Sequence, residues 1–222
     1  IYIASGTNFT AGYYEITAYT DTNTVTLDRD ATNGSDASSG SGKVGGASNH
    51  PANISTSVVG GNEVWIKAGT YTLRSGDTHL LNITVAGVQN SKYGLGWIGY
   101  NSTRGDAPKG DDRPYFDATD ATNGINLGAH NNTFEHIRIA NANGSGIAGN
   151  YINRCINVKV SSCGGTGFAN RGLRIGCEAD SISGVGFASG WNIACYSHDG
   201  SSYGIQWGVR IGCIVDSISS GI

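Results

Sequence analysis

A glycine followed by isoleucine or phenylalanine recurs through the C-terminal half of the chain, at intervals of 17 to 22 residues. The apolar members of this series are Ile125, Ile147, Phe168, Phe187, Ile205 and Ile222. A period near 20 residues is typical of architectures in which each short unit buries its apolar face against the next unit. The sequence therefore predicts a stack of similar units from about residue 120 onward.

Each unit also carries the pattern apolar-x-apolar-x-small, which predicts a β-strand with one buried face. Three inward columns are expected: Ile156, Ile175, Ile193 and Ile211; Val158, Cys177, Cys195 and Cys213; and Val160, Ala179, Ser197 and Val215. Neighbouring parallel strands lie about 4.8 Å apart. Stacked units would therefore bring like side chains together in ladders inside the molecule.

The composition agrees with many strands and tight turns, and it excludes several alternatives. The 222 residues include 35 Gly, 14% are charged, and the formal net charge is −3. No segment of the repeat keeps a helical apolar stripe free of Gly for three turns, and the Leu/Asn consensus of leucine-rich repeats is missing. The lack of a basic excess argues against nucleic acid as a partner. No run approaches the roughly 18 apolar residues of a membrane helix, so we expect no membrane span.

An apolar strand followed by a Gly-Thr-Tyr turn spans Glu63 to Tyr71, and a second strand follows at 96–100. Together with the repeat, these segments resemble the right-handed parallel β-helix of the pectate-lyase-like superfamily, over roughly residues 58–222. Pectate lyases of this fold cluster acids around calcium and use an Arg or Lys base. Polygalacturonases of this fold use three Asp, a Gly-His-Gly and an Arg-x-Lys. Here Ser197-His198-Asp199-Gly200 replaces Gly-His-Gly and no Arg-x-Lys occurs, so the resemblance implies the fold without the catalysis.

The first 50 residues differ from the repeat. Two β-prone runs, 14–19 and 23–28, predict a hairpin, with residues 1–3 as a candidate third strand. Residues 31–50 are rich in Gly and Ser and are expected to be flexible. We therefore expect an N-terminal hairpin or cap module over residues 1–50 and a β-helix over residues 51–222, truncated at its C-terminal end. The hairpin resembles segments that precede β-helices in phage-like and environmental surface proteins.

One outward column of the predicted stack combines acid and base side chains. Alternation along the strand places Glu178 and Asp180 outward, and successive units place Asp180, His198 and Asp216 in one column, about 5 Å apart. Such a column could serve as general acid and base or hold a metal. Carboxylates two units apart, at roughly 9–10 Å, approach the separation used in inverting glycoside hydrolysis. The alternative interpretation is a solvated polar face with a screened His–Asp contact.

Five further residues are candidates for contact with carbohydrate. Arg174 and Arg210 share a column and could bind an acidic sugar, while Trp191, Tyr196 and Trp207 lie in two late units and could stack on sugar rings. The alternatives are surface charges for the two arginines and packing at the corners of the units for the three rings.

The five cysteines show no Cys-x-x-Cys or zinc spacing, which argues against a thiolate metal site. Cys177, Cys195 and Cys213 are 18 residues apart and fall in one column. We expect a ladder of free buried thiols, with disulfides between units as the alternative. We expect no metal ion and no cofactor.

These patterns favour a structural or adhesive shaft of an extracellular assembly, such as a virion tail fibre or spike or a secreted surface filament. Parallel β-helices commonly associate with themselves, so we expect a homo-oligomer or end-to-end packing. The alternatives are a carbohydrate-active enzyme, either a polysaccharide lyase or a glycoside hydrolase, and a non-catalytic glycan-binding module. A polysaccharide is the candidate partner in both, and the expected location is extracellular or the virion surface.

Overall fold

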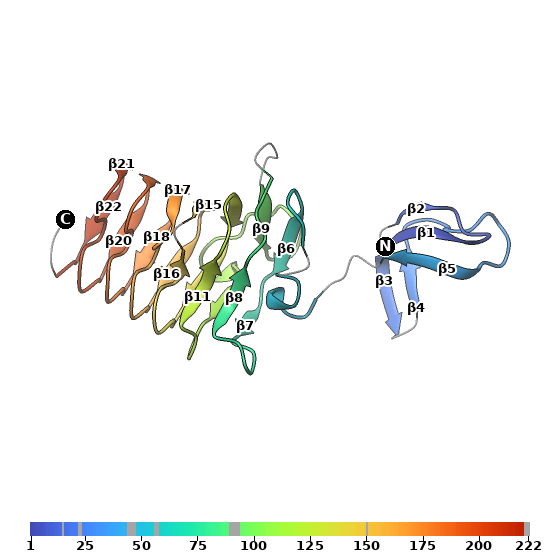
Figure 1. The fold of residues 1–222 in the computed structure, drawn as a ribbon, viewed down its shortest axis with the longest axis horizontal. Helices are drawn as coiled ribbons and strands as arrows, with labels where there is room; N and C mark the ends of the chain where they lie inside the picture. The colour runs from blue at the N-terminus through green and yellow to red at the C-terminus, as the bar shows by residue number, and fades with distance from the viewer. Residues whose placement is uncertain are drawn as a thin grey trace. The chain divides into compact units, whose positions relative to one another are not determined.

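The computed structural model describes residues 1–14, 16–21, 24–43, 48–55, 58–88, 94–149 and 151–219. The chain forms two compact units, Ile1–Asn49 and His50–Ile222, and each is described by itself (Figure 1). The helical segments among the described residues are two short 3-10 helices, η1 (Pro51–Asn53) and η2 (Gly110–Asp112). Within these ranges, no helix has the length and apolarity needed to cross a lipid bilayer.

The unit Ile1–Asn49 contains two antiparallel sheets. Strand β1 (Tyr2–Thr7) pairs with β2 (Gly12–Tyr13) and β5 (Ser38–Lys43), and β3 (Ile16–Asp21) pairs with β4 (Thr24–Leu27). The β3–β4 pair confirms the predicted hairpin. Residues 38–43 were expected to be flexible, but they form β5, because the edge of β1 offers backbone partners to this segment. Ile3, Tyr14 and Ala31 are the buried apolar residues of this unit.

The unit His50–Ile222 is built from three parallel sheets (Figure 1). Sheet I contains β6 (Glu63–Lys67), β9 (Leu95–Tyr100), β12 (Asn132–Glu135), β15 (Ile152–Ile156), β17 (Arg171–Ile175), β19 (Trp191–Ile193) and β21 (Val209–Ile211). Sheet II contains β7 (Thr70–Thr72), β10 (Tyr115–Asp117), β13 (Arg138–Ala140), β16 (Lys159–Ser161), β18 (Glu178–Asp180), β20 (Tyr196–His198) and β22 (Ile214–Asp216). Sheet III contains β8 (His79–Ile83), β11 (Asn123–Leu127) and β14 (Ile147–Ala148), and single bridges continue it through Phe168, Phe187 and Ile205.

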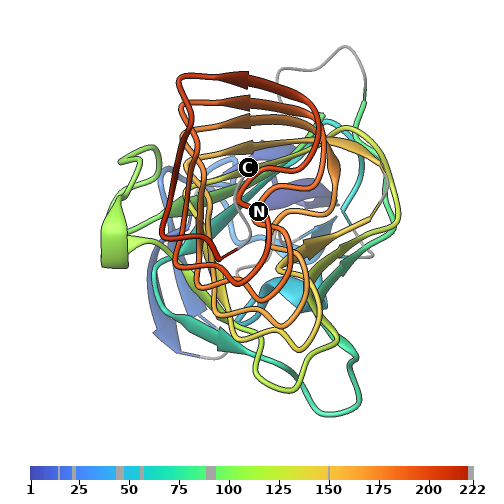
Figure 2. The same cartoon turned by 90° about the vertical axis from the view of Figure 1, so that its left-hand side faces the viewer.

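Each passage of the chain adds one strand to sheet I and then one to sheet II, and we call such a passage a rung. Neighbouring strands of the two long sheets are parallel and in register, so that Asp180 pairs with His198 and His198 with Asp216. Seen from one end, successive rungs overlie one another (Figure 2). This arrangement confirms an all-β unit built on parallel sheets.

The glycine-linked apolar series forms the centre of the core. Ile125, Ile147, Phe168, Phe187 and Ile205 are each 0% exposed, and they face one another across consecutive rungs. The rings of Phe168 and Phe187 stack with centroids 4.8 Å apart and an interplanar angle of 10°. Ile222, the last member of the predicted series, lies outside the described residues. Like side chains thus pile up along the stack, as the repeat predicts.

The second and third predicted columns also face inward over most of their length. Val158, Val160, Cys177, Ala179 and Cys195 are buried. The five cysteines are free thiols, four of them buried and Cys213 half-buried. This confirms the expected ladder of free thiols.

The facing predicted for the isoleucine column is wrong. Ile175 and Ile193 are neighbours across rungs, but both are half-buried, and Ile211 is 52% exposed. Arg174, which precedes Ile175 in β17, is 0% exposed instead. In sheet I the inward position is therefore the one before each isoleucine.

A left-handed corner between sheets I and II explains this inversion. Gly176 has a φ of 59° and Ala194, one rung further on, has a φ of 50°. The alternation of a strand does not continue through such a residue, so Ile175 and Cys177 lie on different faces although they are two positions apart. A second left-handed corner follows sheet II, at residues such as Asn141, Ser162, Ser181, Asp199 and Ser217.

Candidate functional site

Acid and base side chains gather on the outward face of sheet II, across three consecutive rungs. Alternation in β16, β18 and β20 turns Val160, Ala179 and Ser197 inward, so the flanking residues of each strand face outward. We call the set Lys159, Glu178, Asp180, His198 and Asp199 the ion cluster.

The ion cluster is closely paired. Lys159 Nζ lies 2.8 Å from Glu178 Oε1 and 3.0 Å from Asp180 Oδ2. One rung further on, His198 Nε2 lies 3.1 Å from the same Glu178 oxygen, and its Nδ1 lies 2.8 Å from Asp199 Oδ2 and 3.6 Å from Asp180 Oδ1. The side chains of the first four residues are between 15% and 30% exposed. Each rung is thus tied to the next by at least one ion pair.

This pairing sets the charge of both carboxylates. Burial alone would raise the pKa of Glu178, but hydrogen bonds from Lys159 and His198 outweigh it, and the pKa is lowered. In the same way burial opposes ionisation of Asp180, and bonds from Ser181 and Lys159 lower its pKa. Burial likewise opposes the charge on Lys159, whose pKa is nevertheless raised by the two carboxylates. At neutral pH the cluster therefore holds two carboxylates and an ammonium ion.

His198 is the group of the cluster that titrates nearest to neutral pH. Burial favours the neutral imidazole, but hydrogen bonds to Asp199 and Glu178 and the charge of Asp180 raise the pKa above 6.5. The ring also stacks on Tyr196, with centroids 4.4 Å apart and an interplanar angle of 22°. The protonated imidazole can donate from both nitrogens, one toward each neighbouring carboxylate.

The structure brings two of the three predicted acid–base residues together. Asp180 and His198 are in contact, whereas Asp216 shares their column but accepts a hydrogen bond from Ser217 Oγ at 3.4 Å. Sequence reasoning missed the roles of Lys159 and Asp199. The first had a signal, because Lys159 and Glu178 occupy equivalent positions in successive rungs.

The chemistry open to the cluster is limited by this pairing. A glycoside hydrolase needs one protonated carboxylic acid as a proton donor, but both carboxylates here have lowered pKa values. A polysaccharide lyase needs an unprotonated base, whereas the pKa values of Lys159 and His198 are raised. The electrostatics thus favour a stabilising network over an acid–base pair.

The same residues have the composition of a cation site. Glu178, Asp180 and His198 each offer one ligand atom, and these atoms lie within 4.8 Å of one another. Nitrogen and oxygen ligands of this kind suit zinc. Lys159 Nζ already supplies a positive charge to both carboxylates, so a metal ion would compete with a tethered ammonium group.

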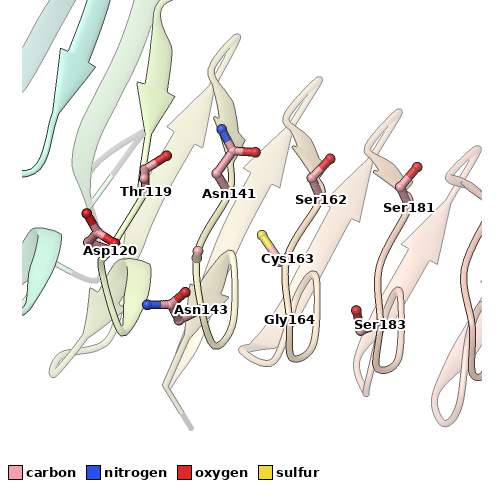
Figure 3. Close-up of a pocket in the computed structure, with 10 residues that line it drawn as sticks. Thr119, Asp120, Asn141, Asn143, Ser162, Cys163, Gly164, Ser181 and Ser183 are labelled. Carbon is pink, nitrogen blue, oxygen red and sulfur yellow. The ribbon is translucent and has the colours of Figure 1, made fainter.

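A shallow polar groove lies beside the ion cluster, along the corner that follows sheet II. It is lined by Thr119, Asp120, Asn141, Ala142, Asn143, Ser162, Cys163, Gly164, Ser181 and Ser183. Asn141, Ser162 and Ser181 repeat at equivalent places in consecutive rungs (Figure 3). Ser181 Oγ donates to Asp180 Oδ1 at 2.7 Å, so one hydrogen bond connects the groove to the cluster.

The predicted carbohydrate-binding residues do not form one site. Tyr196 lies next to the ion cluster on sheet II, whereas Trp191, 57% exposed, begins β19 of sheet I. Trp207 is 68% exposed and follows the bridge that extends sheet III. The three rings are therefore presented by different parts of the rungs.

The prediction that Arg174 is available to a sugar is wrong, because its side chain points into the core. The left-handed corner at Gly176 shifts the inward face of sheet I onto this position. Arg210 shares the column, as expected, through Asn192. Arg210 is exposed, and its Nη2 donates to the carbonyl oxygen of Ile205 at 2.8 Å.

Replacing His198 by Gln is expected to remove a stabilisation that depends on pH. Since the pKa of His198 is raised in the folded chain above 6.5, its protonation stabilises the fold fully below about pH 6.5, and this contribution is lost as the pH rises through the raised value. The difference in Tm between wild type and His198→Gln should be largest near pH 6 and should shrink toward pH 8.5. Asp216→Asn, in the same column, serves as the control without this trend, and a pH-independent difference for His198→Gln would contradict the charge assignment.

No protein-family model, curated protein or solved structure matches this chain.

Proposed function

We propose that this chain is a non-catalytic structural or adhesive module of an extracellular assembly, such as a virion tail fibre or spike or a secreted surface filament. In this proposal His50–Ile222 is a right-handed parallel β-helix of the pectate-lyase-like kind. The order in which the chain visits sheets I and II, with parallel pairing between successive rungs, supports a helix. The general preference for right-handed parallel crossovers supports the hand.

The ion cluster is the observation that carries the non-catalytic interpretation. Acids and bases at the most reactive part of the surface bond one another across rungs, with Glu178 Oε1 shared between Lys159 and His198. Partly buried networks of this kind hold neighbouring strands in place, whereas a catalytic acid or base needs a pKa near the operating pH and access to substrate. A rigid stack with paired charges suits a load-bearing or presenting role.

Exposed apolar side chains support the proposed self-association. Trp191, Trp207, Val209, Ile211 and Ile214 are each between 41% and 68% exposed, and they belong to the last two described rungs. Exposed apolar groups gathered in one part of a molecule mark contact surfaces. We propose that this region meets another copy of the chain or another component of the assembly.

A carbohydrate-directed role is the second candidate, and one observation favours it. The polar groove runs beside Asp180, whose carboxylate bonds the groove residue Ser181. A polysaccharide lying in the groove would therefore pass close to Glu178, Asp180 and His198. In this interpretation the chain is a lyase, a hydrolase or a glycan-binding module.

One set of assays separates these roles. Wild type, Asp180→Asn and Asp216→Asn are incubated with acidic and neutral polysaccharides, and new reducing ends and unsaturated products are measured. The structural proposal expects equal background from all three proteins. Product formed by wild type and by Asp216→Asn but lost in Asp180→Asn would establish an enzyme.

Sedimentation over a range of protein concentrations tests the assembly. Self-association that weakens in a Trp191→Ala/Trp207→Ala variant is the expected result. A strict monomer at all concentrations would contradict the proposed self-association. Glycan-array binding by the monomer would establish the binding module instead.

A further inference from the structure

The inward column of sheet I changes from apolar to polar along the stack. In register it runs through Val64, Trp97, Phe134, Cys155, Arg174, Asn192 and Arg210. Trp97 and Phe134 are 0% exposed and stack on each other, as expected for a core. Two rungs beyond Phe134 the same position is held by a guanidinium group that is also 0% exposed.

The partners of Arg174 are all neutral. Its Nη1 donates to Asn192 Oδ1 at 3.0 Å and to the carbonyl oxygen of Ser189, and its Nη2 donates to the carbonyl oxygens of Phe168, at 3.4 Å, and Asn170. The rings of Phe168 and Phe187 lie 5.8 Å from the guanidinium carbon. Hydrogen bonds to carbonyl groups lower the cost of burying this cation but do not neutralise it.

The nearby thiols do not supply the missing negative charge. Burial raises the pKa of Cys155 to about 12, and burial also raises the pKa of Cys177. Cys177 Sγ donates to the carbonyl oxygen of Cys155 at 3.4 Å, and Cys195 Sγ donates to that of Arg174 at 3.6 Å. Thiols that donate to carbonyl oxygens carry their protons. Among the described residues, the ionisable groups that interact with Arg174 are these three thiols.

Three buried N–H donors around this cation have no partner among the described residues. They are Arg174 Nε, Asn170 Nδ2 and Asn192 Nδ2, and both asparagines are 0% exposed. Each amide group lies against the guanidinium through its oxygen, with Nη–Oδ1 distances of 3.5 Å for Asn170 and 3.0 Å for Asn192. Buried polar groups in folded proteins are almost always satisfied. Since all three groups are donors next to a positive charge, the partner that completes them is an acceptor with a negative charge.

We propose that the interior at Arg174 binds one small monovalent inorganic anion, such as chloride. Arg174 supplies the charge, and Asn170 and Asn192 supply the flanking N–H donors. Arg210 adds a second positive charge two rungs from Arg174 in the same column, and such a pair of cations favours an anion over a neutral water molecule. The bound ion makes the stability of the stack depend on the identity of the anion in solution.

Thermal unfolding at constant ionic strength and pH tests this binding, with chloride exchanged stepwise for gluconate, which is too large for the site. A ligand that binds the folded chain raises its Tm with concentration. Each tenfold rise in chloride above its dissociation constant should add about 3–5 °C. Arg174→Met should abolish this dependence, and Arg154→Met, which removes an exposed arginine of β15, should keep it.

Crystals of the wild-type chain grown in bromide give an independent readout. An anomalous peak in contact with Arg174 Nε and the two asparagine amides is expected. This measurement decides the question even if Arg174→Met fails to fold. A Tm that is equal in chloride and gluconate, or a water molecule in place of the bromide peak, would overturn the proposal.

Discussion

Replacing Phe187 by Ala is expected to lower the free energy of unfolding of His50–Ile222 by about 3–5 kcal/mol. Phe187 is 0% exposed and lies between Phe168 and Ile205 in the central ladder. Removing its ring leaves a cavity between two rungs whose backbones are fixed by parallel pairing, so the site cannot collapse. Urea unfolding, with the change taken from the midpoint at constant slope, measures the loss.

Trp191→Ala is the matched control, because it removes a larger ring from the outward face of the same stack, where the side chain is 57% exposed. A surface change of this kind should alter the free energy of unfolding by roughly 0.5 kcal/mol or less. Equal losses for Phe187→Ala and Trp191→Ala would show that the Phe168–Phe187 ladder is not the core of the unit.

Gly172→Ala is expected to destabilise the chain by about 3 kcal/mol or more, through two separate causes. The φ of Gly172 is 134°, a conformation that L side chains rarely adopt, and its new Cβ would lie 1.8 Å from the carbonyl oxygen of Asn153. That oxygen belongs to the backbone of the preceding rung and cannot move without breaking the pairing of β15 with β17. Strain and overpacking each cost on the order of 1–3 kcal/mol. Thermal unfolding measures the sum.

Gly212→Ala separates the two causes. Gly212 has a φ of 61°, but a Cβ there would meet no atom within 4 Å. Only the conformational cost, about 1–2 kcal/mol, should remain. If Gly172→Ala and Gly212→Ala lose equal stability, the close approach between neighbouring rungs contributes nothing.

The repeat made the stacking predictable, because its period fixes which residues become neighbours. Ile125 and Ile147, and Asp180 and His198, were placed correctly in this way. The facing of the strand before each corner was not predictable. A single left-handed residue inverts the alternation, and Ala194 adopts this conformation in the same column as Gly176 although alanine gives no sequence signal for it.

The same inversion explains the outcome for the candidate site residues. Arg174 has the sequence character of a surface residue, and the corner at Gly176 puts it inside. Lys159 joins the ion cluster through contacts between rungs, which a strand pattern alone does not weigh. Residues 38–43 have a flexible composition, and pairing with β1 overrides it.

The in-register pairing has a consequence for how such a chain can vary in length. Ile175, Ile193 and Ile211 occupy one position in successive rungs, and each is followed by a left-handed residue. Removing residues 176–193 would join Ile175 directly to Ala194, with every later side chain still aligned to its column. Duplication or loss of whole periods in a gene would therefore lengthen or shorten the protein without a change of fold, whereas an insertion of any other size would misalign everything downstream.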